Sequence, residues 1–143
     1  MFGAASLNGR GLIAISPVIW NDAQWLCDDK RRTALTTNGK NGNGNQSYFS
    51  TKYRDYANYG DYAPQIRYAE VLLTLAEASF AAQEDLIKAV LMERRIEFLC
   101  EGKRWADISR LATDATYGTG GIPAKAVNGA DGLAIYNCKG RLI

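Results

Sequence analysis

The chain has 143 residues, of which 47% are hydrophobic and 22% are charged, with a formal net charge of +2. This length predicts one domain with a buried core, over residues 1–143. The absence of histidine excludes histidine-based triads and histidine metal ligands, and the lack of a basic run argues against a nucleic-acid partner.

Three cysteines give an odd count, so at least one thiol stays outside any disulfide within the chain: Cys27, Cys100 and Cys138. None forms a Cys-x-x-Cys pair, and we predict no metal and no cofactor. No apolar run reaches the 18 residues of a membrane-spanning helix. We also expect neither a signal peptide nor a lipid-carrying cysteine motif at the start of this sequence.

The first third of the chain predicts short elements and turns. Pro17 interrupts the apolar run "GLIAISPVIW", so we expect a loop or short strand and then a short helix over Asn21–Cys27. The Asn- and Gly-rich run "TTNGKNGNGNQS" predicts an exposed loop or hairpin tip. It contains no carboxylate, which argues against a calcium loop. "YFSTKY", residues 48–53, is typical of a strand.

Three helices are predicted next, over residues 65–83, 84–102 and 103–112. The first has apolar residues at helical spacing and no internal glycine or proline. It could continue into the second as one long helix. We expect Leu86, Ile87, Val90, Leu91 and Phe98 to mark the buried side of the second helix, Cys100 to be buried in it, and Gly102 to follow its end. On the third helix, Trp105, Ile108 and Leu111 share one predicted core face. We predict a loop from residue 113 onward, with a strand in "GLAIYNC".

Charged and large apolar residues alternate in "ERRIEFLCEGKRW", residues 93–105. Arginine can grip a carboxylate with two hydrogen bonds while its stem packs on apolar groups. We therefore interpret these charges as a structural ion network between helices, with Arg94 and Arg95 bound to acids of a neighbouring helix. A substrate carboxylate clamp or an acid–base pair is the alternative. The predicted network comprises Arg67, Glu70, Glu77, Glu93, Arg94, Arg95 and Glu97.

Two stretches, "IRYAEVLLTLAEASF" and "ERRIEFLCEGKRWADISRL", resemble the C-terminal part of the SusD/RagB family. "DDKRRTAL" and "YFSTKYRDY" precede them in the family's order, and "GGIPAKAVNGADGLAIYN" follows. The resemblance spans roughly residues 15–137. Members of this family are several times longer, carry a lipid-anchoring cysteine, and have a longer segment between the two stretches. This chain therefore resembles a shortened C-terminal fragment.

The resemblance implies a fold and a function. The implied fold is mainly α, with tetratricopeptide-like helices, long irregular loops and a few short strands. "AEASF" fits the A-x-x-x-F part of such a repeat. Family members are surface lipoproteins of the outer membrane in Bacteroidetes-type bacteria. They capture glycans or other nutrients for polysaccharide utilization and deliver them to a SusC-like, TonB-dependent transporter. A glycan and this transporter are thus the implied partners, and the implied role is not that of an enzyme.

Aromatic rings can cover the apolar faces of sugars, while amides and charged groups bind the hydroxyls. We predict ligand contact at Tyr56, Asn58, Tyr59, Trp20 and Trp25. The alternative for the tyrosine-rich segment is that its rings pack under the helices. The alternative function is a helical scaffold that docks on the transporter without binding ligand. An enzyme that uses a carboxylate pair is a third interpretation, and the many basic neighbours of the acids argue against it.

Overall fold

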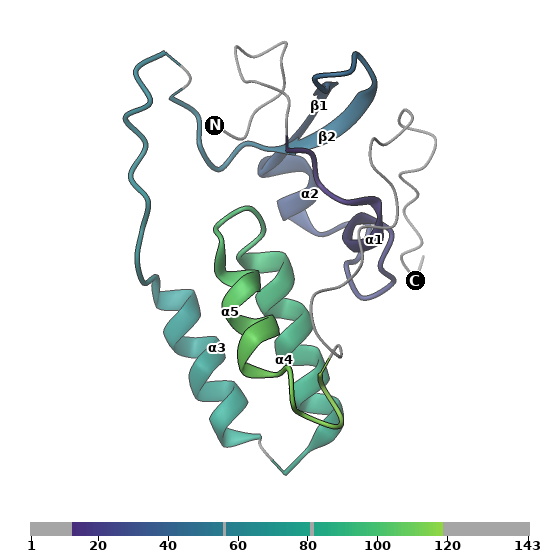
Figure 1. The fold of residues 1–143 in the computed structure, drawn as a ribbon, viewed down its shortest axis with the longest axis vertical. Coiled ribbons are helices and arrows are strands. Elements are labelled where there is room, and N and C mark those ends of the chain that lie inside the picture. The colour runs from purple at the N-terminus through teal and green to yellow at the C-terminus, as the bar shows by residue number, and fades with distance from the viewer. Residues whose placement is uncertain (1–12, 56, 81, 119–143) are drawn as a thin grey trace. The chain divides into compact units, whose positions relative to one another are not determined.

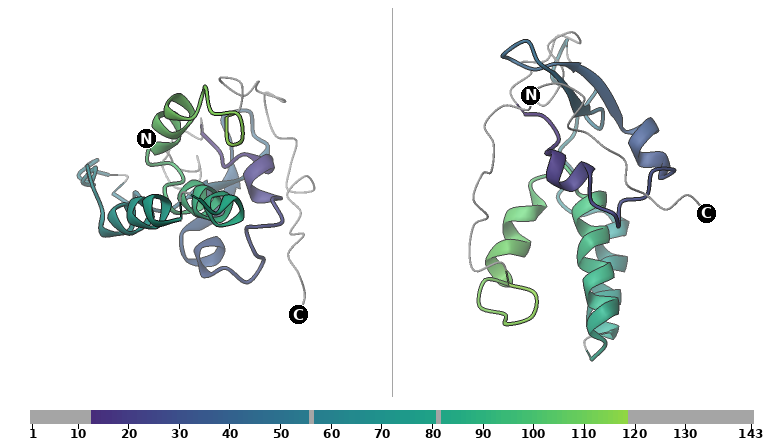
Figure 2. Two further views of the ribbon diagram at one scale, coloured as in Figure 1. Left: turned by 90° about the horizontal axis from the view of Figure 1, so that it is seen from below. Right: turned by 90° about the vertical axis from the view of Figure 1, so that its right-hand side faces the viewer.

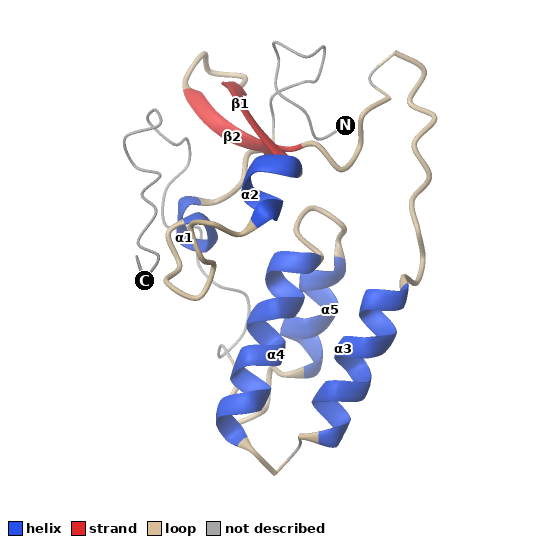
Figure 3. Cartoon of the chain, turned by 180° about the vertical axis from the view of Figure 1, so that it is seen from behind, coloured by secondary structure: helices blue, strands red, loops and turns tan. Residues whose placement is uncertain are grey.

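The computed structural model describes residues 13–55, 57–80 and 82–118. These residues form five helices and one two-stranded antiparallel sheet, so the fold is mainly helical, as predicted (Figure 1 and Figure 3). None of these helices has the length and apolar character needed to cross a membrane. The chain divides into two compact units, the second beginning at residue 63. The single domain over residues 1–143 stays a prediction.

The first unit starts with helix α1, Pro17–Trp20. Ser16 caps it by accepting a hydrogen bond from the Val18 amide, and Pro17 occupies its first turn, where the missing N–H costs nothing. The helix predicted over Asn21–Cys27 is wrong, because these residues form turns. Asp22 accepts a hydrogen bond from the Gln24 amide at 3.0 Å, and such a local bond competes with helix formation.

Helix α2, Lys30–Ala34, is capped by Asp29, whose carboxylate accepts hydrogen bonds from the amide and the guanidinium of Arg31. Strands β1, Thr36–Lys40, and β2, Gln46–Ser50, follow as a hairpin in which Thr36 pairs with Ser50. The predicted hairpin tip is therefore present. The predicted strand over 48–53 ends early, at Ser50, where the chain leaves the sheet.

An arginine between two tryptophans lies at the centre of the first unit. The guanidinium carbon of Arg32 is 4.6 Å from the ring centroid of Trp20 and 4.3 Å from that of Trp25. Its nitrogens donate hydrogen bonds to the carbonyls of Trp20, Trp25 and Leu26. Trp20 also stacks on Tyr48 of β2, with ring centroids 4.0 Å apart. These contacts fix α1 and α2 against the hairpin by a cation–π arrangement and buried hydrogen bonds.

The second unit contains α3, Tyr68–Ser79, α4, Glu84–Glu97, and α5, Lys103–Arg110. Figure 2 shows α3 and α4 side by side, in contact as an antiparallel pair. They are separate helices, because the chain turns between Phe80 and Gln83. The alternative of one long helix is thus excluded.

The buried faces of α4 and α5 differ from the prediction. Ile87 and Phe98 are buried as expected, whereas Leu86 is 40% exposed and Met92 and Ile96 fill the core instead. On α5, Trp105 is 58% exposed and Asp107 is buried at 3%. The indole faces outward because the inner side of α5 is occupied by ion pairs with α3 and α4, described below.

The turn between α4 and α5 contains two left-handed residues. α4 ends at Glu97, so Cys100 lies in the turn, half-buried, with a φ of 65°. It is not buried within a helix as predicted, and it is in no disulfide. Gly102, predicted to follow the end of α4, instead precedes the first residue of α5 with a φ of 78°.

Replacing Gly102 with alanine tests this turn. A Cβ at Gly102 would meet no atom within 4 Å, so the only penalty is the left-handed backbone. We expect Gly102→Ala to lower the free energy of unfolding by about 1 kcal/mol, measured by urea denaturation. Gly102→Asn is the control, because asparagine tolerates this conformation, and it should lose less. Equal stability of the alanine variant and the parent would contradict the assigned φ.

Candidate functional site: an aromatic loop and an ion-paired helix scaffold

The loop after the hairpin is closed by the carboxylate of Asp55. Its two oxygens accept hydrogen bonds from the Asn58 amide at 2.9 Å and the Gly60 amide at 3.0 Å. The Asp55 amide in turn donates to Asp61 at 2.7 Å. A Cβ on Gly60 would lie 2.8 Å from the Asp55 carboxylate, so a side chain at this position would force that carboxylate to shift. These contacts give residues 57–61 a defined conformation.

This loop presents Tyr59 to solvent. Tyr59 has a φ of 57° and is 68% exposed, and nearby Tyr62 is 93% exposed. A left-handed conformation is unfavourable for a residue with a side chain and is often retained at functional positions. Asn58 lies beside Tyr59 and is exposed. The predicted ligand residue Tyr56 lies outside the described residues.

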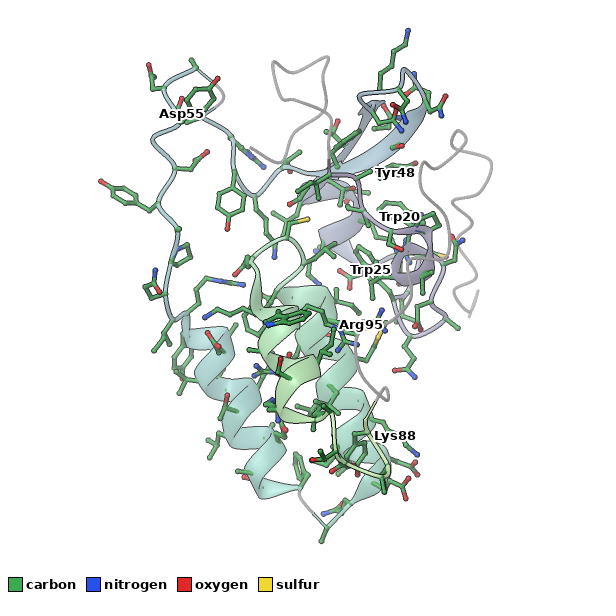
Figure 4. All side chains as sticks on the ribbon, viewed as in Figure 1. Trp20, Trp25, Tyr48, Asp55, Lys88 and Arg95 are labelled. Carbon is green, nitrogen blue, oxygen red and sulfur yellow. The ribbon has the colours of Figure 1, made fainter. Side chains whose placement is uncertain are left out.

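Trp20 and Trp25, also predicted to contact ligand, are 6% and 1% exposed. Figure 4 shows them gathered with Tyr48 in the first unit, away from the loop of Asp55. Their rings meet at 5.4 Å between centroids, edge to face. This burial favours a packing role for both indoles, and ligand contact through them stays a prediction.

In the second unit, Arg67 joins the start of α3 to the end of α4. Its guanidinium binds Glu97 at 2.9 Å and Glu101 at 2.9 and 3.0 Å. The guanidinium carbon also lies 5.2 Å from the ring centroid of Phe98. The hydrogen bonds to both carboxylates raise the pKa of Arg67, although burial opposes them. The arrangement holds the arginine charged and fixed in orientation.

Asp107 of α5 is the centre of a second set of ion pairs. Its carboxylate, 4% exposed, binds Arg94 of α4 at 3.1 Å and Arg110 at 3.0 Å. Arg110 continues to Glu77 of α3 with two hydrogen bonds, and Arg94 reaches Thr74 of α3 at 3.3 Å. One buried carboxylate thus connects three helices.

The remaining predicted network residues have different surroundings. Glu70 binds Lys103 of α5 at 3.0 Å. Glu93 and Arg95 are half-buried on α4. Within the described ranges, Arg95 makes no ion pair. Burial, followed by the charge of Arg95, lowers the pKa of Arg104. Figure 4 labels Arg95 on α4.

Sequence reasoning missed the partners on the α4–α5 turn and on α5, which are Glu101, Lys103, Asp107 and Arg110. The spacing of Lys103, Asp107 and Arg110 places them on one side of a helix, and this signal could have identified them. The apolar spacing of Trp105, Ile108 and Leu111 predicted a different buried face for this helix, so the charged side was not recognised.

A hollow of about 620 Å³ lies among α3, α4 and α5. Its polar wall consists of Glu77, Arg94 and Arg110, which already bind one another or Asp107. Asp114 and Tyr117 also line the hollow, and partial burial, followed by the charge of Glu84, raises the pKa of Tyr117. Since most of the charges here are already paired, the exposed loop of Tyr59 is the better candidate for ligand contact.

Comparison with known proteins supports the resemblance seen in the sequence. Residues 79–137, fewer than half of the chain, match the model of the SusD family, and this match supports the resemblance to the SusD/RagB family. No curated protein and no solved structure matches the chain with significance. Proteins of this family are surface lipoproteins associated with the outer membrane that bind nutrients and are not enzymes. The match thus suggests a nutrient- or glycan-binding surface protein.

Removing Arg94 should destabilise the second unit. In Arg94→Ala the Asp107 carboxylate stays buried and loses one of its two cationic partners, so we expect a loss of about 3 kcal/mol in the free energy of unfolding. Urea denaturation measures this. The control is Lys88→Ala, which breaks an exposed pair with Glu84 and should leave stability unchanged. Equal stability of the two variants would contradict the buried pair.

The loop of Tyr59 should open at acid pH. Hydrogen bonds from the Asn58 and Gly60 amides lower the pKa of Asp55 below its ordinary value of 3.8. The contribution of the Asp55 carboxylate to the stability of the loop is therefore complete above about pH 3.8. It is lost as the pH falls through the lowered pKa. We expect the amide chemical shifts of Asn58 and Gly60 to follow this titration by NMR. In Asp55→Asn they should not titrate, whereas a parent midpoint at or above 3.8 would contradict the arrangement.

Proposed function

We propose that this chain belongs to a cell-surface protein that binds glycans or related nutrients and delivers them to a SusC-like, TonB-dependent transporter of the outer membrane. The match of residues 79–137 to the SusD family is the observation that carries this proposal. The proposed location is the outer face of the outer membrane. The protein holds and transfers its ligand and leaves it chemically unchanged.

The exposed loop supplies the ligand contact in this proposal. A tyrosine ring that is 68% exposed can stack on the apolar face of a sugar. Because Asp55 fixes the backbone of the loop, little conformational entropy is lost when a ligand binds. The adjacent side chain of Asn58 offers an amide to sugar hydroxyls, which need both donors and acceptors. Tyr56 completes the proposed site.

The helices of the second unit act as the scaffold. We propose that α3 and α4 form a tetratricopeptide-like pair, with Ala76 and Phe80 at the positions of the repeat's A-x-x-x-F fragment. The ion pairs of Arg67, Arg94 and Arg110 set the angles between the three helices. Fully partnered charges favour this structural role over a substrate clamp.

The alternative function is a helical module that docks on the transporter without binding ligand. One observation favours it: the family match begins at residue 79 and so covers α4 and α5 but not the loop of Tyr59. Under this alternative, the exposed tyrosines contribute nothing to ligand capture.

Calorimetric titration with soluble oligosaccharides distinguishes the two functions. We expect saturable binding to at least one glycan and a roughly tenfold loss of affinity in Tyr59→Ala, because the stacking surface is removed. Trp105→Ala is the matched control, since it removes an exposed aromatic ring from α5 and should not change affinity.

Two results would count against glycan binding at the loop. Equal affinities of Tyr59→Ala and the parent would place the ligand elsewhere. The absence of binding to every glycan tested, while the chain still associates with the transporter, would favour the docking module.

A further inference from the structure

Cys27 is part of a disulfide bond, whereas Cys100 is in none. The sequence contains one further cysteine, Cys138, which lies outside the described residues. Both Cys27 and Cys138 belong to the first compact unit, which comprises residues 1–62 and 126–143. Within one chain, Cys138 is therefore the cysteine left to pair with Cys27.

We propose that Cys27 and Cys138 form a disulfide that joins the two sequence segments of the first unit. Roughly 110 residues lie between the two cysteines, and they include the whole of the second unit, residues 63–125. The chain leaves the first unit once and returns to it once, and the bond links the outgoing part to the returning part. Closing such a long loop restricts the unfolded chain strongly.

The backbone around Cys27 is fixed by contacts that do not need the disulfide. The guanidinium of Arg32 donates hydrogen bonds to the carbonyls of Trp25 and Leu26, on the two residues before Cys27. The amide of Asp29 donates to the Leu26 carbonyl at 3.2 Å. Cys27 itself is exposed, so an oxidising partner can reach its sulfur. Removal of the bond should leave the contacts of Arg32 intact.

The bond forms by thiol–disulfide exchange with a disulfide oxidoreductase. One thiolate of the chain attacks the disulfide of the oxidoreductase, which forms a mixed disulfide and releases one thiolate of that enzyme. The second thiolate of the chain then attacks the chain's own sulfur in the mixed disulfide and releases the other thiolate. Two electrons and two protons thereby pass from the chain to the oxidoreductase, which ends as a dithiol.

This pairing bears on where the protein is located. Disulfides form and persist in the periplasm and at the cell surface, and they are rare in the reducing cytosol. The bond thus supports the surface location in the proposed function by an observation that is separate from the family match. The pairing does not rest on glycan binding, so either proposal can fail without the other.

Peptide mapping of the unreduced full chain tests the pairing. The chain is exported to a bacterial periplasm, alkylated with iodoacetamide in urea without reductant, and digested with trypsin, which cleaves after lysine and arginine. The three cysteines then lie on separate peptides: 11–30, 96–103 and 126–139. We expect mass spectrometry to show the first and third peptides as one cross-linked species that reduction splits. Cys100, on the second peptide, should be alkylated.

Serine variants give a second measurement. Cys27→Ser and Cys138→Ser should each abolish the cross-linked species, whereas the matched control Cys100→Ser should retain it. Each of the first two should lower the melting temperature of the first unit by about 10 °C, because the unfolded chain gains entropy. The double variant should melt with the single variants, since all three lack the same bond. Near-ultraviolet circular dichroism of Trp20 and Trp25 checks that the variants fold.

Three results would overturn the pairing. The first is alkylation of Cys27 in the unreduced chain. The second is a cross-link between peptides 11–30 and 96–103, which would assign Cys100 to the bond. The third is a bond between two copies, seen as a hybrid cross-link when isotopically labelled and unlabelled chains are oxidised together.

Discussion

The buried carboxylate of Asp107 is the interaction on which the second unit depends. It binds arginines from α4 and from its own helix, and through Arg110 it reaches Glu77 on α3. A single side chain thus sets the position of α5 relative to two other helices. Burying it is favourable only because two cations and several hydrogen bonds replace the water it loses, so the geometry of the three helices is closely specified.

The same ion pairs determine what the helices expose. Because α3 and α5 face each other through charges, their apolar side chains turn to the outside, as Tyr68, Leu75 and Trp105 show. The scaffold is thereby stabilised at its centre by polar contacts and left apolar at its surface. Such an apolar surface suits contact with other protein.

The first unit also has a buried charge, but its partners are of a different kind. Its central cation, Arg32, has backbone carbonyls and two indole faces as partners instead of carboxylates. Trp20 and Trp25 are therefore buried by packing. Among the described residues of this unit, the loop closed by Asp55 exposes the aromatic ring of Tyr59. Ligand capture in the proposed function rests on that loop, while α4 and α5 lie in the region that matches the SusD family.

The sequence by itself determined the mainly helical fold, the three helices of the second unit, the hairpin tip and the resemblance to the SusD family, because periodicity, turn residues and the quoted stretches are local signals. Tertiary structure alone decided which charges meet. Arg94 binds Asp107 although its own sequence neighbours include acids, and Trp105 is exposed although its spacing predicts a core face. It also buried Trp20 and Trp25 and exposed Tyr59, since an aromatic residue is equally suited to a core or a binding surface. Only the packing of distant elements decides between these roles, and spacing along one helix carries no information about it.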